Sequence, residues 1–76
     1  MKVAQFLYSN AVTLASLVFG KLEAGELDEA RLGIDALAAL VPLLHGDAKR
    51  DLGQTLSNLQ LAYAGAVAVA PDRPTE

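Results

Sequence analysis

The sequence contains no cysteine and no tryptophan, and its only aromatic residues are two tyrosines and two phenylalanines. Without cysteine, the chain cannot form a disulfide scaffold or a thiolate metal site. Basic residues are also few, because six Lys and Arg oppose nine Asp and Glu and leave a net charge of −3. Binding to nucleic acid requires clustered Lys and Arg that neutralise phosphates, so we expect no nucleic-acid partner. The length of 76 residues allows one small domain.

Hydrophobic residues make up 53% of the chain, which is too many for a disordered protein. Two long stretches carry no charge, residues 3–20 and residues 52–71, whereas residues 21–51 hold most of the charged side chains. A helix in water normally carries charge along its outer face. We therefore expect two helices whose uncharged surfaces are covered, either by other parts of the protein or by another molecule.

The first uncharged stretch is slightly shorter than the roughly 20 apolar residues that span a membrane. It also contains five polar side chains, which favour a soluble helix: Gln5, Ser9, Asn10, Thr13 and Ser16. A signal peptide would use Lys2 as its positive end, but no clear cleavage site of small residues precedes the acidic stretch. Without a targeting segment we expect a cytoplasmic protein, and a membrane-associated protein anchored by this helix is the alternative.

Apolar residues recur at helical spacing along the chain and nowhere alternate as they would in a strand. The pattern predicts an all-α fold, a three-helix antiparallel bundle with helices at about residues 3–24, 27–44 and 48–70. Each helix has one predicted core stripe. In the first helix it is Ala4, Tyr8, Ala11, Ala15, Val18 and Leu22, and in the second it is Leu27, Ala30, Ile34, Leu37, Val41 and Leu44. In the third helix it is Leu52, Leu56, Leu59, Tyr63, Ala66 and Ala70. Residues 1–70 then form a single helical domain, and residues 71–76 form a flexible C-terminal tail.

Glycine and proline predict where the helices end. Gly25 is suited to a left-handed C-cap at the end of the first helix. Pro42 has no amide hydrogen and clashes with the preceding turn, so the second helix should kink or end near Leu40. We interpret Gly46 as the next C-cap and Asp47 as the N-cap of the third helix.

No group of residues predicts catalysis or metal binding. His45 is the only histidine, and no second ligand follows it at i+3 or i+4 on a helix. The carboxylates Asp28, Glu29 and Asp35 are explained better by a solvated face and the helix dipole than by acid–base work or cation binding. We therefore expect no enzymatic activity, with no catalytic residue, no cofactor and no metal.

Small residues are dense in the first and third helices, which predicts close approach between these helices or between copies of them. Seven large side chains are the candidate interface: Phe6, Tyr8, Leu17, Phe19, Leu61, Tyr63 and Val69. We expect a homo-oligomer, most simply a symmetric dimer, formed by the first helix and the uncharged C-terminal half of the third. The alternative is a helical adaptor that binds another, unidentified protein through the same apolar surface.

The chain resembles two known families, one over a short segment and one over most of its length. Residues 25–42 resemble the second helix of a tetratricopeptide repeat, with Gly25, Ala30, Ile34 and Pro42 at the matching places. A lone repeat cannot bury its faces, so we interpret this match as convergence.

The second resemblance covers nearly the whole chain. It consists of an uncharged helix ending in Gly at residues 14–20, Ala-x-x-x-Ile-Asp-x-Leu-x-x-Leu at residues 30–40 and Leu-x-x-x-Leu-x-x-Leu-x-x-x-Tyr at residues 52–63. This order is similar to a small bacterial family catalogued as a domain of unknown function (number 1844). The resemblance implies a helical fold and a bacterial source, and it implies no activity. The chain departs from that family by having more Ala and less Lys and Glu in its third helix.

Overall fold

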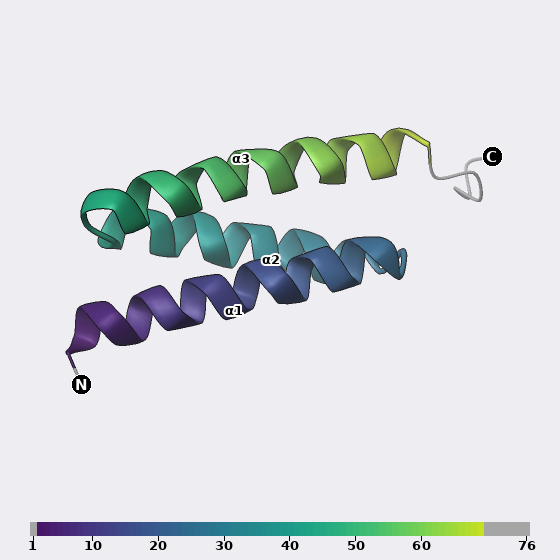
Figure 1. The fold of residues 1–76 in the computed structure, drawn as a ribbon. Helices are drawn as coiled ribbons and strands as arrows, with labels where there is room; N and C mark the ends of the chain where they lie inside the picture. The colour runs from purple at the N-terminus through teal and green to yellow at the C-terminus, as the bar shows by residue number, and fades with distance from the viewer. Residues whose placement is uncertain (1, 70–76) are drawn as a thin grey trace.

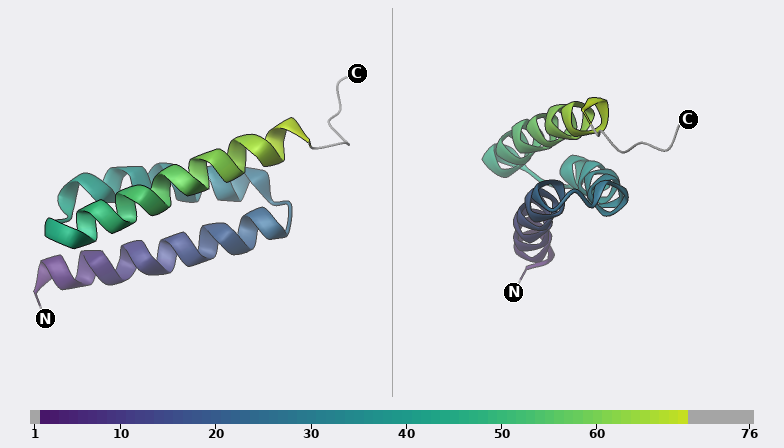
Figure 2. Two further views of the ribbon diagram at one scale, coloured as in Figure 1. Left: turned by 45° about the horizontal axis from the view of Figure 1, so that its top comes forward. Right: turned by 90° about the vertical axis from the view of Figure 1, so that its right-hand side faces the viewer.

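The computed structural model describes residues 2–69, and three helices follow one another within them. Helix α1 spans Val3–Glu23, α2 spans Leu27–Leu40 and continues as the short 3₁₀ helix η1 (Val41–Leu43), and α3 spans Gly46–Ala68. Helices α1 and α3 run in the same direction, and α2 runs antiparallel to both (Figures 1 and 2). Residues 2–69 contain no strand, which confirms the all-α three-helix bundle. Ala70 and the predicted tail lie outside the described residues.

The turn between α1 and α2 confirms the left-handed C-cap at Gly25, whose φ is 77°. The amide of Gly25 donates to the carbonyl oxygen of Leu22 at 3.1 Å, and the amide of Glu26 donates to that of Lys21 at 2.9 Å. This pair of bonds is a Schellman motif, which satisfies carbonyl groups that the end of a helix leaves free. A single glycine therefore reverses the chain without leaving the end of α1 unpaired.

The turn between α2 and α3 confirms one prediction and corrects another. Helix α2 ends at Leu40, as Pro42 predicts, and η1 follows it. The predicted caps at Gly46 and Asp47 are wrong, because α3 begins at Gly46 and its N-cap is His45. Gly46 has a φ of 61°, and the Asp47 carboxylate accepts a hydrogen bond from the Arg50 guanidinium. Because Pro42 already ends α2, the left-handed glycine serves the start of α3.

The buried core is small and apolar, and none of its residues is polar or charged within residues 2–69. Its members are Ala11, Ala15, Val18, Ala30, Ile34, Leu37, Leu44, Leu52 and Leu59. The stripes predicted for the second and third helices agree with this core, apart from Leu27 and Ala66, which are partly buried outside it, and Ala70, which is not described. The stripe predicted for the first helix is wrong at its start, because Ala4 and Tyr8 are exposed while Leu7 packs against the core.

Gly33 of α2 explains how α1 is rotated. A Cβ atom at this position would collide with Cγ2 of Val18 and would lie 3.8 Å from Cδ1 of Leu14. The missing side chain lets the Val18 side of α1 approach the backbone of α2, which turns Tyr8 toward the surface. Helix α1 accordingly packs more extensively against α2 than against α3. The close approach at Gly33 joins the first and second helices, whereas the expected close approach of the first and third helices, or of copies of them, stays a prediction.

Candidate interaction surface

The described residues expose more large apolar side chains than they bury. Six buried residues are larger than alanine: Val18, Ile34, Leu37, Leu44, Leu52 and Leu59. Ten large apolar side chains are exposed: Val3, Phe6, Tyr8, Val12, Leu17, Phe19, Leu32, Leu43, Leu61 and Val69. Single exposed apolar residues are common on soluble proteins, whereas contiguous ones mark interaction surfaces. The arrangement of these ten residues therefore decides whether the protein has such a surface.

Four of the exposed residues form two pairs on opposite sides of α1. Tyr8 and Phe19 are eleven residues apart, which places them within about 20° of each other around the helix. Phe6 and Leu17 have the same spacing, and this second pair lies about 160° around α1 from the first. Val12 lies four residues after Tyr8 on the side of the first pair. We call Tyr8, Val12 and Phe19 the aromatic stripe; they are 46%, 40% and 48% exposed.

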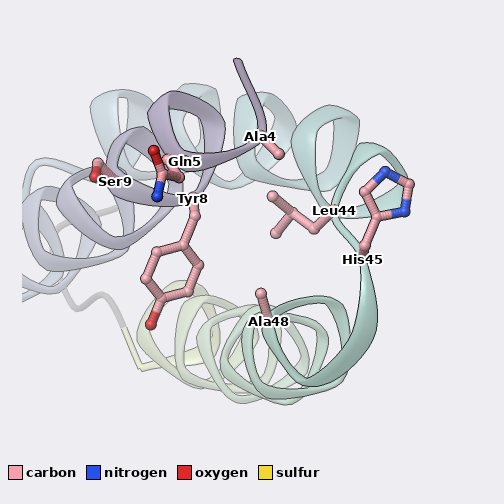
Figure 3. Close-up of a pocket in the computed structure, with 7 residues that line it drawn as sticks. All are labelled: Ala4, Gln5, Tyr8, Ser9, Leu44, His45 and Ala48. Atoms are coloured by element: carbon pink, nitrogen blue, oxygen red, sulfur yellow. The ribbon is translucent and has the colours of Figure 1, made fainter. Parts of the chain in front are cut away.

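An open pocket lies beside the first residue of the aromatic stripe (Figure 3). Its volume is about 410 Å³, and its mostly apolar lining comes from α1, the turn after η1 and the start of α3: Ala4, Gln5, Tyr8, Ser9, Leu44, His45 and Ala48. The Tyr8 ring extends from α1 toward α3, while the buried Leu44 side chain points between the two helices. The His45 ring points away from Tyr8.

The polar side chains around the pocket do not form a connected set. Within residues 2–69, no hydrogen bond joins His45 to Tyr8 or Ser9, and Gln5 Oε1 accepts a bond from the backbone amide of Lys2. In the same part of the chain, no three His, Asp or Glu side chains lie close enough together to hold a metal ion. The pocket is therefore open and mostly apolar, with unconnected polar side chains among its lining residues, and it suits an apolar or aromatic group.

The ion pairs lie at the ends of helices rather than on the aromatic stripe. Lys21 Nζ lies 3.1 Å from Glu26 Oε1 at the turn after α1, and Arg50 Nη2 lies 3.1 Å from Asp47 Oδ1 at the start of α3. Both pairs reach solvent and contribute little to stability. The three residues of the aromatic stripe are uncharged, and the exposed Glu23, four residues after Phe19, is the charged residue beside them on α1.

The remaining predicted interface residues lie on α3 and do not share one surface. Leu61 is 73% exposed and lies about 160° around α3 from the fully buried Leu59. Tyr63 is partly buried and packs against the core. The face of α3 that carries Gly53 lies against Val41 of η1. Val69 is exposed and lies about 160° around α3 from Gly53. Val69 is therefore on the side of α3 that is turned away from η1.

Four exposed apolar residues were not among the sequence candidates, namely Val3, Val12, Leu32 and Leu43. Val12 could have been found, because its four-residue spacing from Tyr8 places it on the same side of the helix. Leu32 and Leu43 belong to a second apolar row of the second helical segment, and the charged residues of that segment predict a solvated face there instead of an interface.

Helix α1 is long and apolar enough to cross a membrane by length and composition, and it is the one such helix within residues 2–69. Core helices of soluble proteins and signal sequences meet the same criterion. However, only 17% of the most apolar window of α1 is buried. Packing against α2 and α3 therefore does not account for the apolar character of this helix.

No family model matches the chain, and no match was found among the curated proteins or the solved structures. The resemblances to the domain-of-unknown-function family and to a tetratricopeptide-repeat helix therefore stay predictions. The structure itself defines the class, which is an all-α three-helix bundle with an uncharged, half-exposed aromatic stripe on α1.

Proposed function

We propose that this protein is a non-enzymatic helical protein that self-associates, most simply as a symmetric dimer, through the uncharged surfaces of α1 and α3. One observation carries the proposal: Phe6, Tyr8 and Phe19 are about half exposed, while the buried core of residues 2–69 contains no aromatic residue. Aromatic side chains dominate the energetics of cores and are enriched at interfaces. The largest apolar side chains thus lie where a partner would bury them.

The charge distribution favours a second copy meeting α1 rather than α2. Each chain carries a net charge of −3, and α2 contributes Asp28, Glu29 and Asp35. A contact between two α2 helices would bring like charges together, which is unfavourable. The side chains of two aromatic stripes can meet without this repulsion because none of them is charged, and the exposed Glu23, four residues after Phe19, is the charged residue on the same side of α1.

The area that a dimer needs explains why the proposal includes α3. A stable interface buries about 800 Å² of each partner. A fully buried aromatic side chain contributes about 150–250 Å², so the half-exposed Tyr8 and Phe19 together offer only about 200 Å². The rest must come from other residues of α1 and from the uncharged C-terminal half of α3, where Leu61 and Val69 are exposed.

Replacing Phe19 by alanine tests the proposal directly. We expect Phe19→Ala to raise the dimer dissociation constant at least about tenfold, because truncating an aromatic anchor of an interface costs about 1.4 kcal/mol or more. Leu32→Ala is the matched control, since Leu32 is an exposed apolar residue on α2. Sedimentation velocity over a concentration series measures both constants, and equal constants for the two variants would contradict the proposal.

The apolar length of α1 supports a second candidate function, association with a membrane. Flotation with phosphatidylcholine vesicles separates the two, because a dimer that buries its α1 helices should stay in the soluble fraction. Recovery of the protein with the vesicles would favour the membrane candidate. A folded monomer that binds neither vesicles nor itself would favour an adaptor whose apolar surface binds a different protein.

A further inference from the structure

We infer that two copies pair through antiparallel α1 helices, with Tyr8 of each copy packed against Phe19 of the partner subunit. This inference rests on the proposed self-association and specifies its geometry, namely the side of α1 that is used and the register of the two helices. It also assigns an occupant to the pocket beside Tyr8, which receives the Phe19 ring of the partner subunit.

The aromatic stripe is self-complementary under a two-fold axis. When two antiparallel helices meet midway between residues 13 and 14, each residue i lies opposite residue 27 − i of the other copy. Tyr8 then lies opposite Phe19, and Val12 lies close to the two-fold axis, while Ala15 stays buried in the core of its own copy. Tyr8 and Phe19 differ by only about 20° around α1, so both can face the same partner helix. A symmetric dimer requires this kind of self-complementary surface, and every contact in it occurs twice.

The position of the pocket agrees with this register. Its α1 side is lined by Ala4, Gln5, Tyr8 and Ser9, Ala48 lies across from them on α3, and Leu44 lies between (Figure 3). Residues 4–8 of one copy face residues 19–23 of the other, and Phe19 is the only aromatic side chain in that segment. A volume of about 410 Å³ is within the range of small-molecule sites, so an aromatic ring fits into the apolar lining.

The opposite side of α1 is less suitable, although Phe6 and Leu17 repeat the same spacing. Asn10 and Thr13 lie between them at helical spacing and would occupy the centre of a contact on that side. Asn10 Nδ2 donates to the carbonyl oxygen of Phe6 at 2.8 Å, which directs the amide toward its own helix. Burying polar groups without partners from the other copy is unfavourable. The aromatic stripe, by contrast, has the apolar Val12 between Tyr8 and Phe19, with Ser16 as the exposed polar residue four positions after Val12.

Disulfide trapping tests the register, because the chain has no cysteine of its own. A chain with Tyr8→Cys is mixed with a mass-tagged chain carrying Phe19→Cys under reducing conditions, and the mixture is oxidised. In the mixed dimer, one contact becomes the cysteine pair while the other contact keeps its native Phe19 and Tyr8. We expect the mixed disulfide to dominate, because identical positions in the two copies would lie about 16 Å apart along the helices.

Phe6→Cys mixed with Leu17→Cys is the control, since these residues have the same spacing and similar exposure on the other side of α1. Circular dichroism checks that all four variants fold. In a protein that light scattering shows to be dimeric, absence of the mixed disulfide or its dominance in the control pair would overturn the register while leaving self-association intact. A native protein that is monomeric at every concentration would overturn both.

Discussion

Gly33 in α2 and Gly53 in α3 differ in how much space is available for a side chain. A side chain at Gly33 would collide with Val18, which is 1% exposed and belongs to the buried core. A side chain at Gly53 would meet Cγ1 of Val41 at an ordinary contact distance of 3.8 Å. Gly33 is therefore required for the packing of α1 on α2, whereas Gly53 mainly lowers the helix propensity of α3.

Alanine at these two glycines should change stability in opposite directions. Gly33→Ala is expected to destabilise the protein by about 1–3 kcal/mol, because overpacking outweighs the gain in helix propensity. Gly53→Ala should stabilise it by up to about 1 kcal/mol, since the same gain comes without a clash. Urea unfolding at one fixed protein concentration compares the two free energies. Equal stabilisation by both substitutions would show that Val18 does not pack against Gly33.

The orientation of Tyr8 shows what apolar spacing alone cannot predict. Ala4 and Tyr8 continue the spacing of Ala11 and Val18, so the sequence places all four on one stripe. The structure rotates α1 so that Leu7 packs against the core and Tyr8 lies at the surface. That rotation depends on contact with a glycine on another helix, and periodicity within one helix carries no information about it.

The two turns between helices differ in how well local chemistry predicts them. At Gly25 one residue type determines the outcome, because a φ of 77° and the Schellman bonds favour glycine strongly. In the second turn Pro42 and Gly46 both signal a helix end, and only the proline acts on α2. The sequence shows both signals, but it does not show which of the two residues ends α2.

Substitution of Gly25 tests the first turn. We expect Gly25→Ala to destabilise the protein by about 1 kcal/mol, because alanine is strained at a positive φ. Gly25→Asn should cost less, since asparagine tolerates the left-handed region. Thermal unfolding followed by circular dichroism ranks the two variants. An alanine variant as stable as the wild type would mean that the turn does not need a left-handed residue.

At the scale of the whole molecule, the uncharged runs of the sequence predict that apolar surface is exposed. They do not predict how this surface is distributed over the faces of the bundle. Residues 3–20 do form a helix that keeps much of its apolar surface exposed. The seven candidate residues lie on several faces, because their positions depend on how each helix is rotated in the bundle. The aromatic stripe joins only Tyr8 and Phe19 of that set.

The proposed dimer should respond to salt in a characteristic way. Its interface contains no ion pair, and each copy carries a net charge of −3, so the remaining electrostatic effect between copies is repulsion. Salt screens such repulsion between exposed charges. Raising sodium chloride from about 50 to 500 mM should leave the dissociation constant unchanged or lower it, as measured by sedimentation equilibrium. Dissociation at high salt would indicate an interface held by ion pairs instead.

Self-association is best tested by the native mass, determined by light scattering behind size exclusion over about a hundredfold dilution. The proposed dimer predicts twice the 8.0 kDa mass of the chain at high concentration, with no larger species, because a two-fold interface is closed. A well-folded protein with the mass of a single chain at every concentration would contradict it, since the half-exposed Tyr8 and Phe19 would then have no second copy to bury them.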